Sequence, residues 1–338
     1  MSTSPLASTN QTRDTSTMAS LWRRGVAYLT DSSALWFLGY TMGVVLSRQL
    51  MRLGAYEPLV GCFVAIAYFT WFDSKLGSGQ SPGKRWMKVR VVDGEGRPIL
   101  AVRALARSVV FVVPVLLWSL NLPVSRTPWP LSAAIILVVY GVGGATFSLL
   151  LFDKVRRRGL HDFATQSYVV DARSGGMVKV PTAKAMPFIV LGAWLLTVAA
   201  GGLVLDKQME SEKLYRRERI DVGLVERIEG VQRGVVRDVL LHDPHTGRAD
   251  STLDVSVVLG ANATDQQAIA NQAARLILQN DQTARSYDEL RVRTFTGYDI
   301  GIASRWKHQE FDHSPAEWES LGSGGQPTVP TVQTHQQR

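Results

Sequence analysis

The chain has 338 residues, of which 46% are apolar, and its mean hydropathy of +0.02 averages an apolar N-terminal part with a polar C-terminal part. Residues 1–206 contain 21 Lys and Arg against 10 Asp and Glu, whereas residues 207–338 contain 16 against 19. The basic residues lie between apolar runs and not on an aromatic-studded sheet or a recognition helix, which argues against nucleic-acid binding. The single cysteine, Cys62, excludes an intramolecular disulfide and a cysteine-based zinc site.

The N-terminal half combines a polar tail with apolar runs. Residues 1–20 are rich in Ser and Thr and have no apolar core, so the sequence predicts a disordered tail and not a secretory signal. A membrane-spanning helix needs about 20 residues. Four of the five apolar runs are long enough; Pro58–Phe72, with 15 residues, is either a short span or an interfacial hairpin arm. The runs are Gly25–Ser47, Pro58–Phe72, Ser108–Ser125, Thr127–Phe152 and Ala185–Leu205.

The distribution of basic residues predicts the orientation of these spans. The Pro-rich stretch NLPVSRTPWP, residues 121–130, is typical of a turn between two antiparallel helices. The N-terminal tail and the segments 75–107 and 154–184 together hold 18 Lys and Arg, whereas the opposing segments hold three. Because cytoplasmic loops carry the excess, the sequence predicts an inner-membrane protein with a cytoplasmic N-terminus and an extracytoplasmic C-terminal domain.

The remainder of the chain is predicted as a linker, an anchor, a stalk and a small domain. Residues 173–184 form a cytoplasmic linker, 185–205 a fifth transmembrane helix and 206–230 a charged, helical stalk. An α+β domain is expected over 231–320, and the low-complexity end, 321–338, is expected to be disordered.

The periodicity within this domain predicts its elements. Val235–Leu241 and the alternating Leu253–Leu259 indicate two strands joined by the turn DPHTGR. Thr264 and Gln267 form a capping box that begins a helix with Ile269, Ala273, Leu276 and Ile277 on one face. Leu290–Phe295 and Tyr298–Trp306 indicate two more strands, which gives a strand, strand, helix, strand, strand order.

One carboxylate lies inside an expected membrane helix. An aspartate there costs roughly 2.5–3.5 kcal/mol, so it needs a partner, a polar cavity or a transported ion. Asp31 follows Arg24 by seven residues, about 10.5 Å along one helix face, and the hydroxyls of Thr30, Ser32 and Ser33 adjoin it. Two interpretations stay open. Either Asp31 exchanges a proton for a cation, or it forms a buried ion pair with Arg24 or Arg107 that fixes helix packing.

The other candidate residues favour structural roles. Asp162 follows four basic residues and is expected to form an interfacial salt bridge with Arg158 or Lys84. The loop GSGQSPGKR, residues 77–85, lacks the Ser or Thr that a Walker loop places after its lysine, which argues against nucleotide hydrolysis. The boundary charges Asp73, Asp153 and Glu57 are interpreted as interfacial. The His-rich stretches HDPH, residues 242–245, and HQEFDH, residues 308–313, are interpreted as solvated loops and not as metal sites.

Several of these residues occur in an order that resembles a known family. Arg24 and Asp31, Asp162 in RRRGLHDFATQSYVV, the loop GSGQSPGKRWMKVRVVDGEGRPI and Arg107 together resemble the RDD family of integral membrane proteins over residues 22–172. The family is named for one arginine and two aspartates. The resemblance implies a four-helix transmembrane domain over 21–172, for which transport, including cation or proton exchange, is the usual suspicion.

Two functional hypotheses follow. The first is transport of a proton or small cation at Asp31, gated by Arg24, which would require a homo-oligomer because four or five helices are few for a pathway. The second is a membrane-anchored sensor or assembly scaffold whose extracytoplasmic domain binds a protein or ligand. In neither case do we expect an enzyme, a cofactor or a metal, since no nucleophile elbow or zinc motif occurs.

Overall fold

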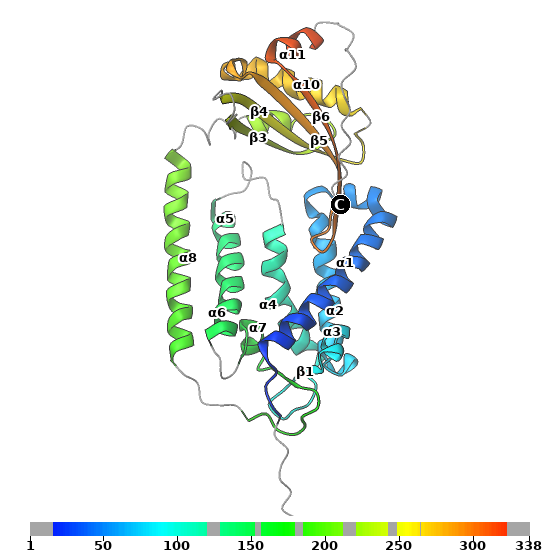
Figure 1. Cartoon of the computed structure of the whole chain (residues 1–338), viewed down its shortest axis with the longest axis vertical. Helices are drawn as coiled ribbons and strands as arrows, with labels where there is room; N and C mark the ends of the chain where they lie inside the picture. Colours follow the sequence, from blue (N-terminus) through cyan, green and yellow to red (C-terminus); the bar gives the residue numbers. More distant parts are fainter. Residues whose placement is uncertain are drawn as a thin grey trace, which may run out of the picture. The chain divides into compact units, whose positions relative to one another are not determined.

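The computed structural model describes seven segments of the chain, whose helices and strands are drawn in Figure 1. The chain forms two compact units. The first unit comprises residues 1–35, 63–117 and 137–198, and the second comprises residues 36–62, 118–136 and 199–338. The described residues are 16–119, 129–152, 157–179, 185–211, 221–242, 249–263 and 265–322.

Most of the N-terminal half is helical, as the apolar runs predict. Helix α1 extends over Leu21–Met51, and a 3-10 turn, Gly54–Tyr56, leads into α2. A π-helical segment, η3, separates α5 from α6. The elements are α2 (Glu57–Asp73), α4 (Ala101–Ser119), α5 (Trp129–Ile136), η3 (Leu137–Gly143), α6 (Gly144–Phe152) and α8 (Met186–Ser211).

Three helical stretches in the described part of the chain are long and apolar enough to cross a membrane. They are Gly54–Asp73, Ala101–Trp118 and Ala134–Phe152, so the run at Pro58–Phe72 extends to a full spanning length. Helix α1, which contains the expected first span Gly25–Ser47, is not among them, so that span stays a prediction. Helix α4 begins at Ala101, seven residues before the apolar run Ser108–Ser125, and therefore includes Arg103 and Arg107. The apolar part of α8, Phe188–Gly201, is shorter, so its length and composition do not confirm a fifth span.

A small two-stranded sheet completes the first unit. Strand β1 (Val89–Val92) pairs antiparallel with β2 (Tyr168–Asp171), with Val91 opposite Val169. Short elements flank the strands: η2 (Lys75–Gly77), α3 (Pro82–Trp86) and α7 (Leu160–Ala164). Ser16 and Met18, which were expected in the tail, instead form isolated bridges with Val178 and Val170.

The C-terminal domain has the predicted α+β order. Its sheet has the order β3-β4-β5-β6; β4 and β5 are parallel and joined through α10, and the outer pairs are antiparallel. The strands are β3 (Val231–His242), β4 (Ala249–Leu259), β5 (Glu289–Asp299) and β6 (Ser304–His313), and the helices are α10 (Gln266–Asn280) and α11 (Pro315–Gly322).

Several details of this domain differ from the expectation. The last two strands meet at a turn over Ile300–Ala303 and not near Gly297, so HQEFDH lies on β6 and not in a loop. Asp265 is the N-cap of α10, because its side chain accepts from the Ala268 N–H. Thr264 and most of the HDPH turn, residues 243–248, lie outside the described residues.

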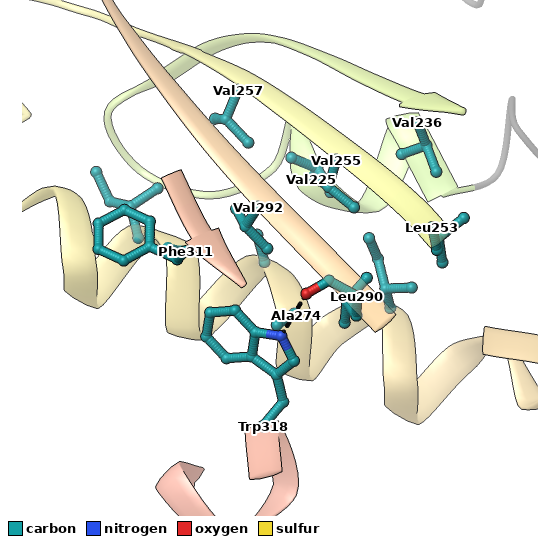
Figure 2. Close-up of a cluster of buried hydrophobic side chains, with 14 of the residues drawn as sticks. Val225, Val236, Leu253, Val255, Val257, Ala274, Leu290, Val292, Phe311 and Trp318 are labelled. Atoms are coloured by element: carbon teal, nitrogen blue, oxygen red, sulfur yellow. Dashed lines mark hydrogen bonds between the residues drawn. The ribbon is translucent and has the colours of Figure 1, made fainter. Parts of the chain in front are cut away.

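The apolar core of the domain lies between the sheet and its helices (Figure 2). Leu253, Val255 and Val257 of β4 are fully buried, as their alternation predicts. The buried Trp318 of α11 donates from its indole Nε1 to the Leu290 carbonyl oxygen over 2.7 Å. Val225, from the segment expected to be a stalk, also belongs to this core, so the domain begins before residue 231.

Truncation of this core should destabilise the domain. Leu253→Ala removes buried apolar surface in the middle of the sheet and should lower the free energy of unfolding by about 2–5 kcal/mol. Hydrogen exchange of β4 and β5 peptides in the full chain measures the change. The control is Lys307→Ala, at an exposed position of β6, which should change stability by less than about 0.5 kcal/mol. Equal exchange in the two variants would contradict the assigned core.

Candidate functional site

Asp162, near the start of α7, accepts from two arginines. The Arg24 Nη2 lies 2.6 Å from Oδ2, and the Arg107 Nε and Nη2 lie 3.0 and 2.8 Å from Oδ1. The Gly159 N–H, at the first turn of α7, also points at Oδ2 over 3.3 Å. The carboxylate is fully buried. These contacts bring α1, α4 and α7 together at one side chain.

The same Arg107 joins Asp162 to a second buried carboxylate. Its Nη1 donates to Asp73 at the end of α2, and the Lys84 Nζ of α3 donates to the other oxygen of Asp73. Asp73 is fully buried. Arg24, Asp162, Arg107, Asp73 and Lys84 therefore form one continuous series of alternating charges, which we call the charge chain.

Asp31 lies beside the charge chain but is held differently. Its carboxylate accepts from the Tyr68 hydroxyl over 2.9 Å, the Gly83 N–H over 2.8 Å and the Ser81 hydroxyl. Asp31 is fully buried, and none of the ion pairs in the described part of the chain includes it. All three groups that donate to this carboxylate are thus neutral.

The sequence SPGK builds the contact between α3 and α1. Ser81 caps α3 by accepting from the Lys84 N–H, and Pro82 occupies the first helical position, where its fixed φ is favourable. A side chain at Gly83 would place its Cβ 2.2 Å from the Ala27 carbonyl oxygen. Only glycine therefore lets this loop approach α1 closely enough for its N–H to reach Asp31.

A buried histidine adjoins the arginine-bound carboxylate. The His161 Nε2 lies 3.4 Å from the Asp162 Oδ1, and the imidazole contacts the Phe111 ring at 5.1 Å between centroids. Burial lowers the pKa of His161 to about 3, against the attraction of Asp162, so the imidazole is neutral at neutral pH. Its Nδ1 is buried without a hydrogen-bond partner among the described residues.

Three neighbouring basic side chains favour the ionised form of Asp162. Burial alone would raise its pKa, but His161 and the guanidiniums of Arg107 and Arg24 hold the pKa well below the ordinary value. Burial lowers the pKa of Lys84, while the adjacent Asp73 opposes that shift. The charge chain therefore holds Asp162 ionised by direct contact with cations.

The structure corrects several expected partnerships. Asp162 does not pair with Lys84, and Arg158 donates to the Asp162 backbone carbonyl over 2.8 Å and lies over the Tyr168 ring at 4.4 Å. Asp31 pairs with neither Arg24 nor Arg107. Thr30 and Ser33 donate to carbonyl oxygens of their own helix, four residues earlier, and not to Asp31.

Other residues of the site were missed in the sequence. Asp73 was interpreted as an interfacial charge, although it is fully buried between two cations. Tyr68, Ser81 and His161 were not proposed at all. For Ser81 a signal existed, because Ser followed by Pro is typical of a helix start. Tyr68 and His161 carry no such local pattern.

The arrangement has definite chemical consequences. Within the described residues, no three His, Cys, Asp or Glu side chains gather as a metal site would require. Removing one partner of a buried ion pair leaves an uncompensated charge, so the loss of any one charged group of the charge chain is costly. Protonation of Asp31, by contrast, breaks no ion pair.

The neutral His161 predicts a pH dependence of stability. The unfolded imidazole binds a proton below about pH 6.5 and the folded one only near pH 3, so the folded unit loses stability as the pH falls through this window. The loss is at most about 1.4 kcal/mol per pH unit. Asp162 adds to it mainly below its ordinary pKa of 3.8, so the range from pH 6.5 to 4.5 separates the contribution of His161 from that of Asp162.

Thermal unfolding in detergent at several pH values measures this effect. His161→Gln should flatten the fall in midpoint between pH 6.5 and 4.5, whereas His308→Gln, on β6 of the other unit, should not. The same pH dependence in both variants would contradict a buried, neutral His161.

Comparison with known families agrees with this geometry. The model of the RDD family matches residues 18–166, a range that includes all residues of the charge chain and Asp31. No curated protein and no solved structure matches the chain. Residues after 166, including the α+β domain, lie outside the family match. Residues 18–166 therefore form an RDD-family domain with helices apolar enough to cross a membrane, and the C-terminal α+β domain lies outside it.

Proposed function

We propose that the RDD domain exchanges a proton for a small cation across the membrane, and that Asp31 is the group that changes its protonation state. The observation that carries this proposal is that Asp31 is fully buried and, among the described residues, receives hydrogen bonds from neutral donors alone. A carboxylate without a paired cation is the group in the site whose charge can change at the lowest cost.

The carboxylates of the charge chain differ from Asp31, and this difference supports the assignment of the exchanging group to Asp31. Asp73 and Asp162 each contact two cations, so their protonation would leave buried guanidinium or ammonium charges unpaired. We assign them a structural role, in which they hold α1, α2, α4 and α7 around Asp31. Arg24 belongs to this framework through Asp162 and not to a gate in direct contact with Asp31.

The proposal includes an assembly and an orientation. Few helices per chain favour a homo-oligomer that encloses the pathway. The excess of Lys and Arg in the segments 75–107 and 154–184 favours an inner-membrane protein with these segments in the cytoplasm and the α+β domain outside. We propose no catalytic activity for either part.

A sensor or scaffold is the second candidate, and one observation favours it. The α+β domain has its own buried core of strand and helix residues, which a minimal exchanger does not need. In this role the domain binds an extracytoplasmic protein or ligand, and the RDD domain is its membrane platform.

Flux measurements in proteoliposomes test the exchange. Asp31→Asn should reduce proton movement driven by Na⁺, K⁺ or Li⁺ gradients to background, because the amide cannot bind the proton. The control is Glu95→Gln, which makes the same chemical change at an exposed carboxylate of the first unit. Both variants must elute as single species in detergent. Wild-type protein without flux for any of the three cations would favour the scaffold.

Labelling of single cysteines tests the orientation. In a Cys62→Ala background, Ser320→Cys on α11 should react with an impermeant maleimide added outside spheroplasts, because the α+β domain is extracytoplasmic. Glu95→Cys should react only after lysis, because it lies in the basic segment 75–107. Both positions are exposed, so the side of the membrane decides the result. The reverse pattern would overturn the orientation.

A further inference from the structure

The tip of the β5–β6 hairpin contacts residues of α1 and α2 within the second unit. This unit contains residues 36–62, from the second half of α1 and the start of α2, together with the C-terminal domain. Tyr298, Ile300 and Ala303 of the tip are buried in one apolar cluster with Leu50. The partly buried members of the cluster are Tyr40, Met42, Val60 and Ile302.

Three glycines allow this close approach. A Cβ at Gly43 would lie 2.1 Å from the Tyr298 ring, and a Cβ at Gly61 would lie 1.8 Å from the Ile300 carbonyl oxygen. At Gly39 the Cβ would lie 2.8 Å from the Ile302 side chain. Gly39 and Gly43 are four residues apart on α1 and so occupy one helix face. We call this surface of Gly39, Gly43 and Gly61 the glycine seat.

Hydrogen bonds fix the tip at the edges of the glycine seat. The Asp299 N–H donates over 2.7 Å to the Glu57 Oε2, whose side chain is buried at the start of α2. The Tyr298 hydroxyl donates to the Tyr40 carbonyl oxygen over 3.3 Å. The Asp299 carboxylate accepts from the Gly301 N–H over 2.8 Å, which shapes the turn itself.

A second strand adds to the attachment. Gln232, near the start of β3, donates from Nε2 to the Met51 carbonyl oxygen at the end of α1. A carbonyl there has no partner within its own helix, so this bond also caps α1. Asp299 and Arg233 attract one another, and burial is the main cause that raises the pKa of Asp299. Apolar contacts and hydrogen bonds therefore attach both β3 and the hairpin tip to α1 and α2.

We propose that the hairpin tip, Tyr298–Ala303, is an intramolecular latch: its seat on Gly39, Gly43 and Gly61 holds the α+β domain on helices α1 and α2. Glycine weakens a helix, so two on one face of α1 are best explained by the element that lies against them. The latch attaches the domain to the same helix that carries Asp31. The attachment stands whether or not Asp31 exchanges protons.

The latch has a consequence for the domain's mobility. A domain joined only by a linker moves independently of its anchor, whereas one fixed by a buried tip moves with α1. Because the tip also contacts Leu50 and Glu57, on either side of the α1–α2 connection, the latch requires the α+β domain to share the side of the membrane on which that connection lies.

Filling the glycine seat tests the latch. Gly43→Val in the full chain should release the tip, so that peptides covering 36–62 and 296–306 exchange hydrogen at least about tenfold faster, while β4 and α10 keep their protection. The matched control is Gly25→Val on the same helix, where a Cβ meets nothing within 4 Å. Unchanged exchange at the tip in Gly43→Val would overturn the proposal.

A disulfide provides a second test at Gly39, where the three nearest atoms to an added Cβ belong to the side chains of Ile302 and Ala303, which can shift more easily than backbone. A Cβ at Gly39 would lie 3.1 Å from the Ala303 Cβ, close to the separation that a disulfide requires. In a Cys62→Ser background, the pair Gly39→Cys and Ala303→Cys should cross-link on mild oxidation, detected by mass spectrometry of the joined peptides. Gly39→Cys with Ser320→Cys is the control pair.

The two tests distinguish failure of folding from failure of the proposal. If Gly43→Val also accelerates exchange in β4 and α10, the cross-linking result decides. Cross-linking of the seat pair alone supports the latch. No cross-link in the seat pair, or an equal yield in the control pair, would overturn it.

Discussion

The structure of the RDD domain depends on one bridging guanidinium. Arg107 lies between Asp73 and Asp162, so a single side chain of α4 neutralises carboxylates from α2 and α7, while Arg24 of α1 and Lys84 of α3 complete the series. Taking charges out of water is costly, and only contact with opposite charges and further hydrogen bonds offsets that cost. The elements that carry these charges must therefore meet in one arrangement.

The charge chain gives meaning to the different environment of Asp31. The same loop that supplies Lys84 to Asp73 also supplies Ser81 and the Gly83 N–H to Asp31. In this short segment, Lys84 forms the ion pair with Asp73, whereas Ser81 and Gly83 donate hydrogen bonds to Asp31. The proposed proton exchange rests on this contrast between ion-paired carboxylates and one that accepts from neutral donors.

The C-terminal domain is stabilised mainly by its apolar core. Its sheet and α10 bury an apolar core that needs no membrane, and its strand alternation is that of a sheet with one covered face. The contact of its hairpin tip with Gly39, Gly43 and Gly61 adds a specific attachment beyond the chain connection. The α+β domain and the RDD domain are thus distinct in composition but joined through α1 and α2.

The sequence by itself determined the features that local pattern controls. Apolar runs predicted the helices, alternation in Leu253–Leu259 predicted β4, and the order of Arg24, Asp31, Arg107 and Asp162 indicated the family. Only the tertiary structure decided which charged residues form ion pairs with one another. Arg24 and Asp162 are 138 residues apart, and Arg107 and Asp73 are 34 apart, so no spacing rule links them. The hairpin turn at Ile300–Ala303 was also predicted at the wrong place. Its apolar residues pack against α1 and α2, and in the sequence alone they resemble the apolar residues of a strand. Periodicity is a property of one element, whereas partner choice follows from how closely separate elements approach.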